Sequence, residues 1–151
     1  SVMCIRDRMP TYYIMDLNMG MAETVDLHMP SDLEVAANTW LTEKELAVYT
    51  EEYGRTGFQG GLNSYRMGST GIGTAESQLY AGKTIDQPSM FISGASDWGT
   101  YQNPGSFERM QETACTDMRA VHLISGAGHW VQQEQAEETS RLLLEFLRDL
   151  S

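Results

Sequence analysis

Two short apolar segments, each followed by a turn of small residues, constrain the fold of this chain more than any other feature. Residues 89–93 (Ser-Met-Phe-Ile-Ser) and 120–124 (Ala-Val-His-Leu-Ile) have the length and composition of buried strands. The first leads into a turn that contains Asp97, and the second into a turn that contains His129. In open α/β sheets, ligands and catalytic groups gather at the carboxyl ends of the strands. We therefore predict that Asp97 and His129 lie at the same edge of a parallel sheet.

An aspartate beside a histidine supplies two of the three groups of a hydrolytic triad. A carboxylate on one imidazole nitrogen selects the tautomer and stabilises the cation that forms during proton transfer. His129 is then a candidate general base, and Asp97 is the acid that orients it. The structural alternative is that each side chain bonds only the backbone of its own turn. Asp86 and Asp117 are the other candidate acids, and each is less well placed at the end of a strand.

The third group of a triad, the nucleophile, has no motif in this sequence. The chain contains no Gly-x-Ser-x-Gly elbow, and no strand–nucleophile–helix unit precedes Asp97. On α/β-hydrolase sheets the nucleophile comes first along the chain, followed by the acid and then the histidine. The triad visible in this sequence is therefore incomplete.

The charge balance argues against several classes of partner. The 151 residues include 10 Lys and Arg and 21 Asp and Glu, and the formal net charge of −11 disfavours nucleic acid and anionic membranes. No apolar run is long enough to span a membrane. Acidic residues gather at Glu134, Glu137 and Glu138, a pattern typical of a solvated helix face.

Motifs of common cofactor and metal sites are also missing from the sequence. There is no P-loop, no dinucleotide-binding Gly-x-Gly-x-x-Gly and no His-Glu-x-x-His. Cys4 and Cys115 are too few for a disulfide framework, and neither lies in a Cys-x-x-Cys spacing. We expect a cytoplasmic protein with no metal and no cofactor.

The clearest helix pattern covers residues 40–53. Thr42 and Glu45 form a capping box before it, and Gly54 is placed to end it. Residues 55–66 contain several glycines, so we predict a turn there.

Further helices are predicted at residues 74–80, 104–113 and 134–150. The last is amphipathic, and its predicted buried stripe consists of Leu143, Phe146, Leu147 and Leu150.

The segment of residues 9–25 is rich in methionine and tyrosine. Such side chains line an adaptable apolar pocket or pack an ordinary core, and the sequence leaves both interpretations open. The residues concerned are Tyr12, Tyr13, Met15, Met19 and Met21.

In this order and at these distances, three segments resemble an α/β-hydrolase of the epoxide-hydrolase type. Residues 40–46 and 57–66, the latter ending in Asn-Ser-Tyr-Arg, resemble the cap helix and the cap tyrosine turn of that family. Residues 91–97 resemble the strand that carries the catalytic acid, and residues 126–130 (Gly-Ala-Gly-His-Trp) resemble the catalytic-histidine loop. The resemblance covers nearly all of residues 9–151.

The resemblance implies a role for each matching residue. His129 would activate the hydrolytic water, and Asp97 would orient and charge-balance it. Tyr65 would donate a hydrogen bond from the cap to the epoxide oxygen, assisted by Tyr13, with Tyr12 as the competing position. An aspartate nucleophile would form an ester with the substrate, and the activated water would then release a diol. Substrate contacts are expected from Tyr12, Met15, Trp98 and Trp130, and the substrate would be a small apolar epoxide.

The resemblance also implies a division of the chain. Residues 84–151 would form the C-terminal part of the α/β-hydrolase core, with the last two strands of a mainly parallel sheet and their flanking helices, and residues 9–83 would form a helical cap. Residues 1–8 have the look of a non-native leader. The nucleophile, the oxyanion-hole loop and most of the sheet would lie upstream of Ser1. We therefore expect this chain by itself to be inactive and marginally stable.

Three other functions remain open at this point. A haloalkane or haloacetate dehalogenase and a serine esterase share the scaffold and differ in the nucleophile. A non-catalytic fragment with an apolar pocket is the alternative outside the enzymes.

Overall fold

The computed structural model describes residues 16–150, apart from the side chain of Ser77. These residues form two compact units, one of which is Leu41–Thr84. The other combines the described residues before Leu41 with those after Thr84. The predicted leader and the predicted roles of Tyr12, Tyr13 and Met15 lie outside the described residues.

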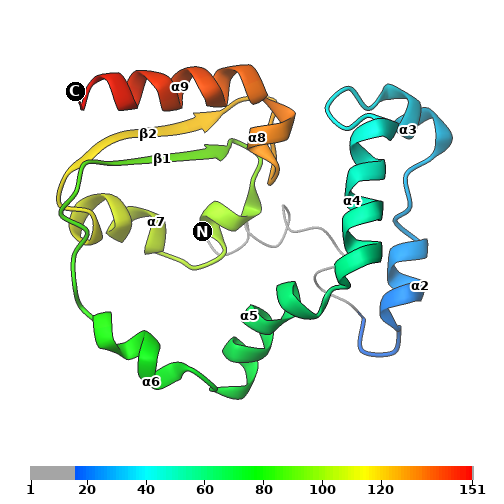
Figure 1. The fold of residues 1–151 in the computed structure, drawn as a ribbon, viewed down its shortest axis with the longest axis horizontal. Coiled ribbons are helices and arrows are strands. Elements are labelled where there is room, and N and C mark those ends of the chain that lie inside the picture. Colours follow the sequence, from blue (N-terminus) through cyan, green and yellow to red (C-terminus); the bar gives the residue numbers. More distant parts are fainter. Residues whose placement is uncertain (1–15, 151) are drawn as a thin grey trace. The chain divides into compact units, whose positions relative to one another are not determined.

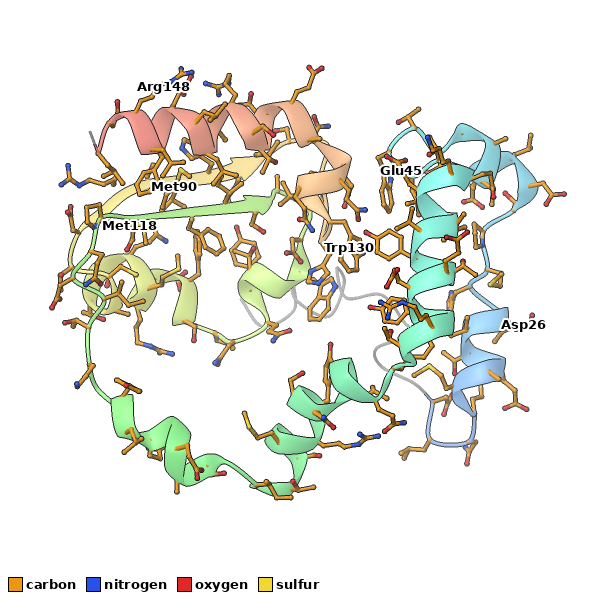
Figure 2. The ribbon with its side chains drawn as sticks, viewed as in Figure 1. Asp26, Glu45, Met90, Met118, Trp130 and Arg148 are labelled. Carbon is orange, nitrogen blue, oxygen red and sulfur yellow. The ribbon has the colours of Figure 1, made fainter. Side chains whose placement is uncertain are left out.

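Both predicted strands form, and they pair in parallel as expected. β1 (Ser89–Gly94) lies beside β2 (Met118–Ile124), and both arrows point the same way in Figure 1. Met90 and Met118, labelled in Figure 2, lie near the beginnings of the two strands. Gly94 pairs with Ile124 at the other end, so the two strands end at the same level of the sheet.

Helices pack on both faces of this strand pair. Successive side chains of a strand point to opposite faces. Ile92 packs against a buried cluster that includes Leu142 of α9 (Ala136–Arg148). Its neighbour Phe91 contacts Phe107 of α7 (Ser106–Arg109), with ring centroids 5.5 Å apart. Figure 1 shows α9 and α7 on opposite sides of the strands.

The predicted buried stripe of the last helix is wrong by one position. Leu142 is buried and Phe146 is half-buried, whereas Leu143 and Leu147 are 46% and 58% exposed. Leu150 is also exposed. Residues 142–144 are all leucine, so the helical period fits either of two neighbouring stripes, and contact with the sheet selects the one through Leu142.

The helices around the strands are more broken than the sequence predicts. The last helical region consists of α8 (Val131–Glu134) and α9, separated at Gln135. The predicted helix at residues 104–113 begins at Ser106, two residues after Pro104, as α7. It ends in a π-helical turn, η4 (Met110–Ala114).

The regular structure of the unit Leu41–Thr84 consists of helices. Its elements are α4 (Glu43–Thr56), α5 (Gln59–Thr70), α6 (Thr74–Ser77) and the 3₁₀ turn η2 (Gln78–Tyr80). The predicted capping box is confirmed, because the Thr42 hydroxyl accepts from the Glu45 N–H at 3.3 Å. The predicted short helix at residues 74–80 is confirmed as α6 and η2.

The predicted turn at residues 55–66 is wrong, because most of it is helix α5. Gly54, Gly60 and Gly61 lie inside helices, where a side chain would meet nothing within 4 Å. The break instead falls at Gly57, whose φ of 68° favours glycine. A glycine costs a helix only about 1 kcal/mol relative to alanine, so glycine content alone does not define a turn.

Before this unit lie two short helices, α2 (Met21–Asp26) and α3 (Asp32–Ala37). A second capping box, Ser31 with Glu34, begins α3. No helix among residues 16–150 is long and apolar enough to cross a lipid bilayer.

The capping box of α4 predicts a pH dependence. Hydrogen bonds from the Thr42 backbone and hydroxyl hold the pKa of Glu45 below its usual value. A lowered pKa in the folded state stabilises the helix above the unfolded-state pKa, and this contribution is lost as the pH falls through the folded-state pKa. The ¹³Cα shifts of residues 43–47 should therefore move toward coil values between about pH 5 and pH 3. In the matched variant Glu45→Gln, residue 45 no longer titrates, so the change at residues 44, 46 and 47 should be absent. The same pH dependence of these three residues in both chains would contradict the prediction.

Candidate active site at the ends of the two strands

The turns that follow β1 and β2 are hydrogen-bonded to each other. The Ala95 N–H donates to the Ile124 carbonyl at 2.8 Å, and the Ser96 N–H donates to the Ala127 carbonyl at 3.0 Å. Ala127 is almost fully buried at 2% exposure, so the second turn is anchored in the core. These bonds hold the two turns side by side, so the residues that follow one turn lie close to those that follow the other.

Close approach of the two turns depends on Gly94. A Cβ atom at this position would overlap the carbonyl oxygens of Ala127 and Gly128. Both are backbone atoms, which cannot rotate away as the end of a flexible side chain can. Only glycine therefore fits at the end of β1.

Asp97 is held by hydrogen bonds from its own turn. Its Oδ1 accepts from the Gly99 N–H at 2.8 Å. Its Oδ2 accepts from the Ser93 hydroxyl at 3.2 Å, and that hydroxyl also lies 2.9 Å from the Thr100 hydroxyl. Ser93 is buried, and the Asp97 side chain is only 12% exposed. The carboxylate is thus surrounded by hydrogen-bond donors, which fix its orientation.

His129 meets this carboxylate as predicted. Its Nδ1 lies 3.1 Å from Asp97 Oδ1. Because a carboxylate oxygen can only accept, Nδ1 carries the proton and Nε2 carries the lone pair. No other hydrogen bond to the ring is present among residues 16–150. The side chain is 52% exposed.

Two tryptophans flank the imidazole. The Trp98 ring stacks on it with centroids 6.0 Å apart and an interplanar angle of 13°. Trp130, labelled in Figure 2, meets it edge-on at 5.5 Å. These contacts restrict the ring plane and keep its Nδ1 toward Asp97.

An open groove of about 440 Å³ begins at Asp97 and His129. Its apolar lining includes Phe91, Phe107 and Met110. The predicted substrate contacts Trp98 and Trp130 do not line it. They contact the histidine instead.

Known proteins resemble this chain closely enough to identify its family. No protein-family model matches it. Epoxide hydrolase B of Mycobacterium tuberculosis is 41% identical over 112 residues, which are 74% of this chain and 30% of that protein. The solved structure of potato (Solanum tuberosum) epoxide hydrolase I has a TM-score of 0.66 and 30% identity, covering 76% of this chain and 36% of that one.

This chain belongs to the epoxide-hydrolase-like α/β-hydrolases. Epoxide hydrolase A of M. tuberculosis, 43% identical over 111 residues, covers 74% of this chain and 33% of that protein. The epoxide hydrolase from Vigna radiata has a TM-score of 0.66 at 26% identity, over 74% of this chain and 37% of that one. The chain spans about a third of the length of the curated relatives it matches. The predicted family and the predicted α/β class with its parallel strands are confirmed.

The remaining predicted residues of this epoxide-hydrolase-like chain lie outside the turns that carry Asp97 and His129. Tyr65 lies on α5 and is 77% exposed, in the unit Leu41–Thr84. The fallback acid Asp86 bonds the Thr116 hydroxyl at 2.8 Å, and Asp117 pairs with Arg119. Within residues 16–150, no group of three or more His, Cys, Asp or Glu could hold a metal ion.

Sequence reasoning missed two residues of this site. The sequence pattern places Ser93 in a strand and predicts no further role, although a serine at the buried end of an apolar strand needs a polar partner. For Glu134, the sequence predicts a place on a solvated helix face together with Glu137 and Glu138. Its carboxylate instead bonds the backbone on both sides of His129.

Proposed function

We propose that this chain supplies the acid–base half of an epoxide hydrolase, in which His129 activates the hydrolytic water and Asp97 orients His129. One observation carries the proposal. Nδ1 faces a carboxylate oxygen at 3.1 Å, the side chain is 52% exposed, and no hydrogen bond to Nε2 is present among residues 16–150. A base needs this arrangement to take a proton from water.

The proposed reaction has two stages. An aspartate carboxylate attacks an epoxide carbon, the ring C–O bond breaks, and the alkoxide takes a proton from Tyr65, assisted by Tyr13 or Tyr12. Water then adds to the carbonyl carbon of the resulting ester and gives a proton to His129 Nε2. Collapse of the tetrahedral intermediate passes that proton from His129 to the departing oxygen and releases a vicinal diol. The second proton of the water, left on the regenerated aspartic acid, returns to the Tyr65 phenolate, so every group regains its starting state.

The nucleophile in this proposal comes from outside the described residues. Among residues 16–150, no Asp, Ser or Cys side chain bonds Nε2 of His129. We propose that the nucleophile belongs to a longer parent protein, with residues 84–151 in its core and residues 9–83 in its cap. By itself, this chain is then inactive.

The substrate class follows from the lining and the relatives. Phe91, Phe107 and Met110 offer apolar contacts beside His129, which suit a small apolar or aromatic epoxide rather than a charged one. The relatives named above are epoxide hydrolases, and this does not favour the dehalogenase and esterase alternatives.

A diol assay tests the proposal. The longest protein encoded by the reading frame that contains this chain should convert an aryl epoxide such as styrene oxide to its diol. The substitution His129→Asn should lower kcat by about 10³-fold, because general-base catalysis is lost. Arg55→Gln, on the outer surface of α4, is the matched control and should change little. Halide release or ester hydrolysis without diol would overturn the assignment, and clear diol formation by the 151-residue chain would overturn its predicted inactivity.

A further inference from the structure

The turn that carries His129 is held by a carboxylate from the following helix. Glu134 Oε2 accepts from the Gly128 N–H at 2.8 Å, and Oε1 accepts from the Trp130 N–H at 2.9 Å. These two N–H groups belong to the residues directly before and after His129. One side chain therefore spans the peptide units on both sides of the proposed base.

The strength of this contact exceeds that of an ordinary turn bond. Hydrogen bonds to an ionised acceptor are roughly twice as strong as neutral ones, and here one carboxylate receives two. Glu134 is half-buried. Its own N–H donates to the Trp130 carbonyl at 2.9 Å, so both the backbone and the side chain of Glu134 bond to Trp130. Glu134 is thus bonded to the turn through its backbone and through its side-chain carboxylate.

Other contacts complete the support of the turn. Ala127 is fixed from the opposite side by the Ser96 N–H. The backbone of Ala127 therefore bonds to Ser96, and the backbones of Gly128 and Trp130 bond to the Glu134 carboxylate, on both sides of His129. The direction of the imidazole depends on this frame, because its Nδ1 must reach Asp97 Oδ1 at 3.1 Å.

We propose that Glu134 is a positioning residue, which holds residues 128–130 so that His129 presents Nδ1 to Asp97 and Nε2 to the substrate side. The proposal rests on the proposed function of His129 as the base. It assigns Glu134 no contact with the substrate. A solvated helix-face glutamate would have neither bond, and the neighbouring Glu138 shows this ordinary role in its exposed pair with Arg141.

Two readouts of the 151-residue chain test this without any activity. The first is hydrogen exchange of the Gly128 and Trp130 amides, which should be at least about tenfold faster in Glu134→Ala, because bonds to a charged group are lost. The second is the imidazole ¹⁵N spectrum of His129, in which the Nδ1–H tautomer should give way to the Nε2–H tautomer. With only three histidines in the chain, the His129 signals are assignable from a His129→Asn sample.

Matched variants separate positioning from general stability. Glu134→Gln keeps one acceptor oxygen, so it should protect one of the two amides and preserve part of the tautomer preference. Glu137→Gln removes the same charge three residues away and should change neither readout. In the longer protein, Glu134→Gln should lower kcat and leave KM nearly unchanged.

Specific outcomes would overturn the proposal. Unchanged exchange and tautomer in both Glu134 variants would do so, as would equal changes in Glu137→Gln. Exchange of both amides at unfolded-chain rates in the unaltered protein would also do so, because the two bonds would then not form. A longer protein without diol formation, but with the expected exchange and tautomer results, would refute the proposed function and leave the positioning role intact.

Discussion

Replacing Gly94 by alanine is expected to lower the free energy of unfolding by about 3 kcal/mol, the upper part of the usual range for overpacking. The new methyl group would overlap the carbonyl oxygens of Ala127 and Gly128. Neither oxygen can move away easily, because Ser96 bonds to Ala127 and Glu134 bonds to Gly128. The strain should therefore separate the two turns.

Urea unfolding and NMR measure the two consequences of this change. The stability loss should appear as a lower midpoint, and the separation of the turns should appear as loss of the Nδ1–H signal of His129. Gly54→Ala is the matched control, because Gly54 lies in helix α4 with nothing within 4 Å of an added Cβ. It should be neutral or stabilising by up to about 1 kcal/mol. A Gly94→Ala chain as stable as the Gly54→Ala chain would show that the two turns do not approach as described.

Replacing Asp97 is expected to have the largest effect on catalysis, and the effect should depend on the replacement. Asp97→Ala removes the partner of Nδ1 and should lower kcat of the longer protein by about 10⁴-fold, as expected when the orienting acid of a triad is lost. Asp97→Asn should be milder, with a loss of about 10²-fold, because the structure orients the new amide. Gly99 N–H can only donate, and it shares Oδ1 with His129. The amide oxygen should therefore stay at the Oδ1 position and still accept from Nδ1, while the NH₂ group faces the Ser93 hydroxyl.

Two measurements check this order of effects. Intact-mass analysis during turnover should show the covalent ester accumulating in both variants, because only the water-dependent stage needs the acid. The ¹⁵N spectrum of the 151-residue chain should keep the Nδ1–H tautomer in Asp97→Asn and lose it in Asp97→Ala. Equal loss of activity and of the tautomer in the two variants would refute the role given to Gly99.

Prediction from sequence succeeded where the pattern was local. The strands were recognisable because short runs of apolar and β-branched residues are typical of buried strands. The capping box of α4 was recognisable because it consists of two residues at a fixed spacing. The turn predicted at residues 55–66 failed because glycine weakens a helix without ending it, and the break needed the positive φ of Gly57.

The apolar content of the last helix was also predictable, but its orientation was not. Three consecutive leucines satisfy more than one helical stripe. Leu142 is the buried leucine because it packs against Ile124 and Val131. Both residues lie near Leu142 in space but outside the helical repeat that the sequence shows.

The Asp97–His129 pair shows which features follow from the residue order and which depend on the folded structure. The residue order alone places an acid and a base after two successive strands, and parallel strands end at one edge of a sheet, so the two side chains are expected near each other. That the two side chains meet at 3.1 Å depends on the folded chain, in which Gly94 allows the backbones of the two turns to approach closely. The folded structure also shows that Glu134 supports His129. Which glutamate of a helix reaches a neighbouring turn depends on where the backbone folds back, and the local sequence does not encode that position.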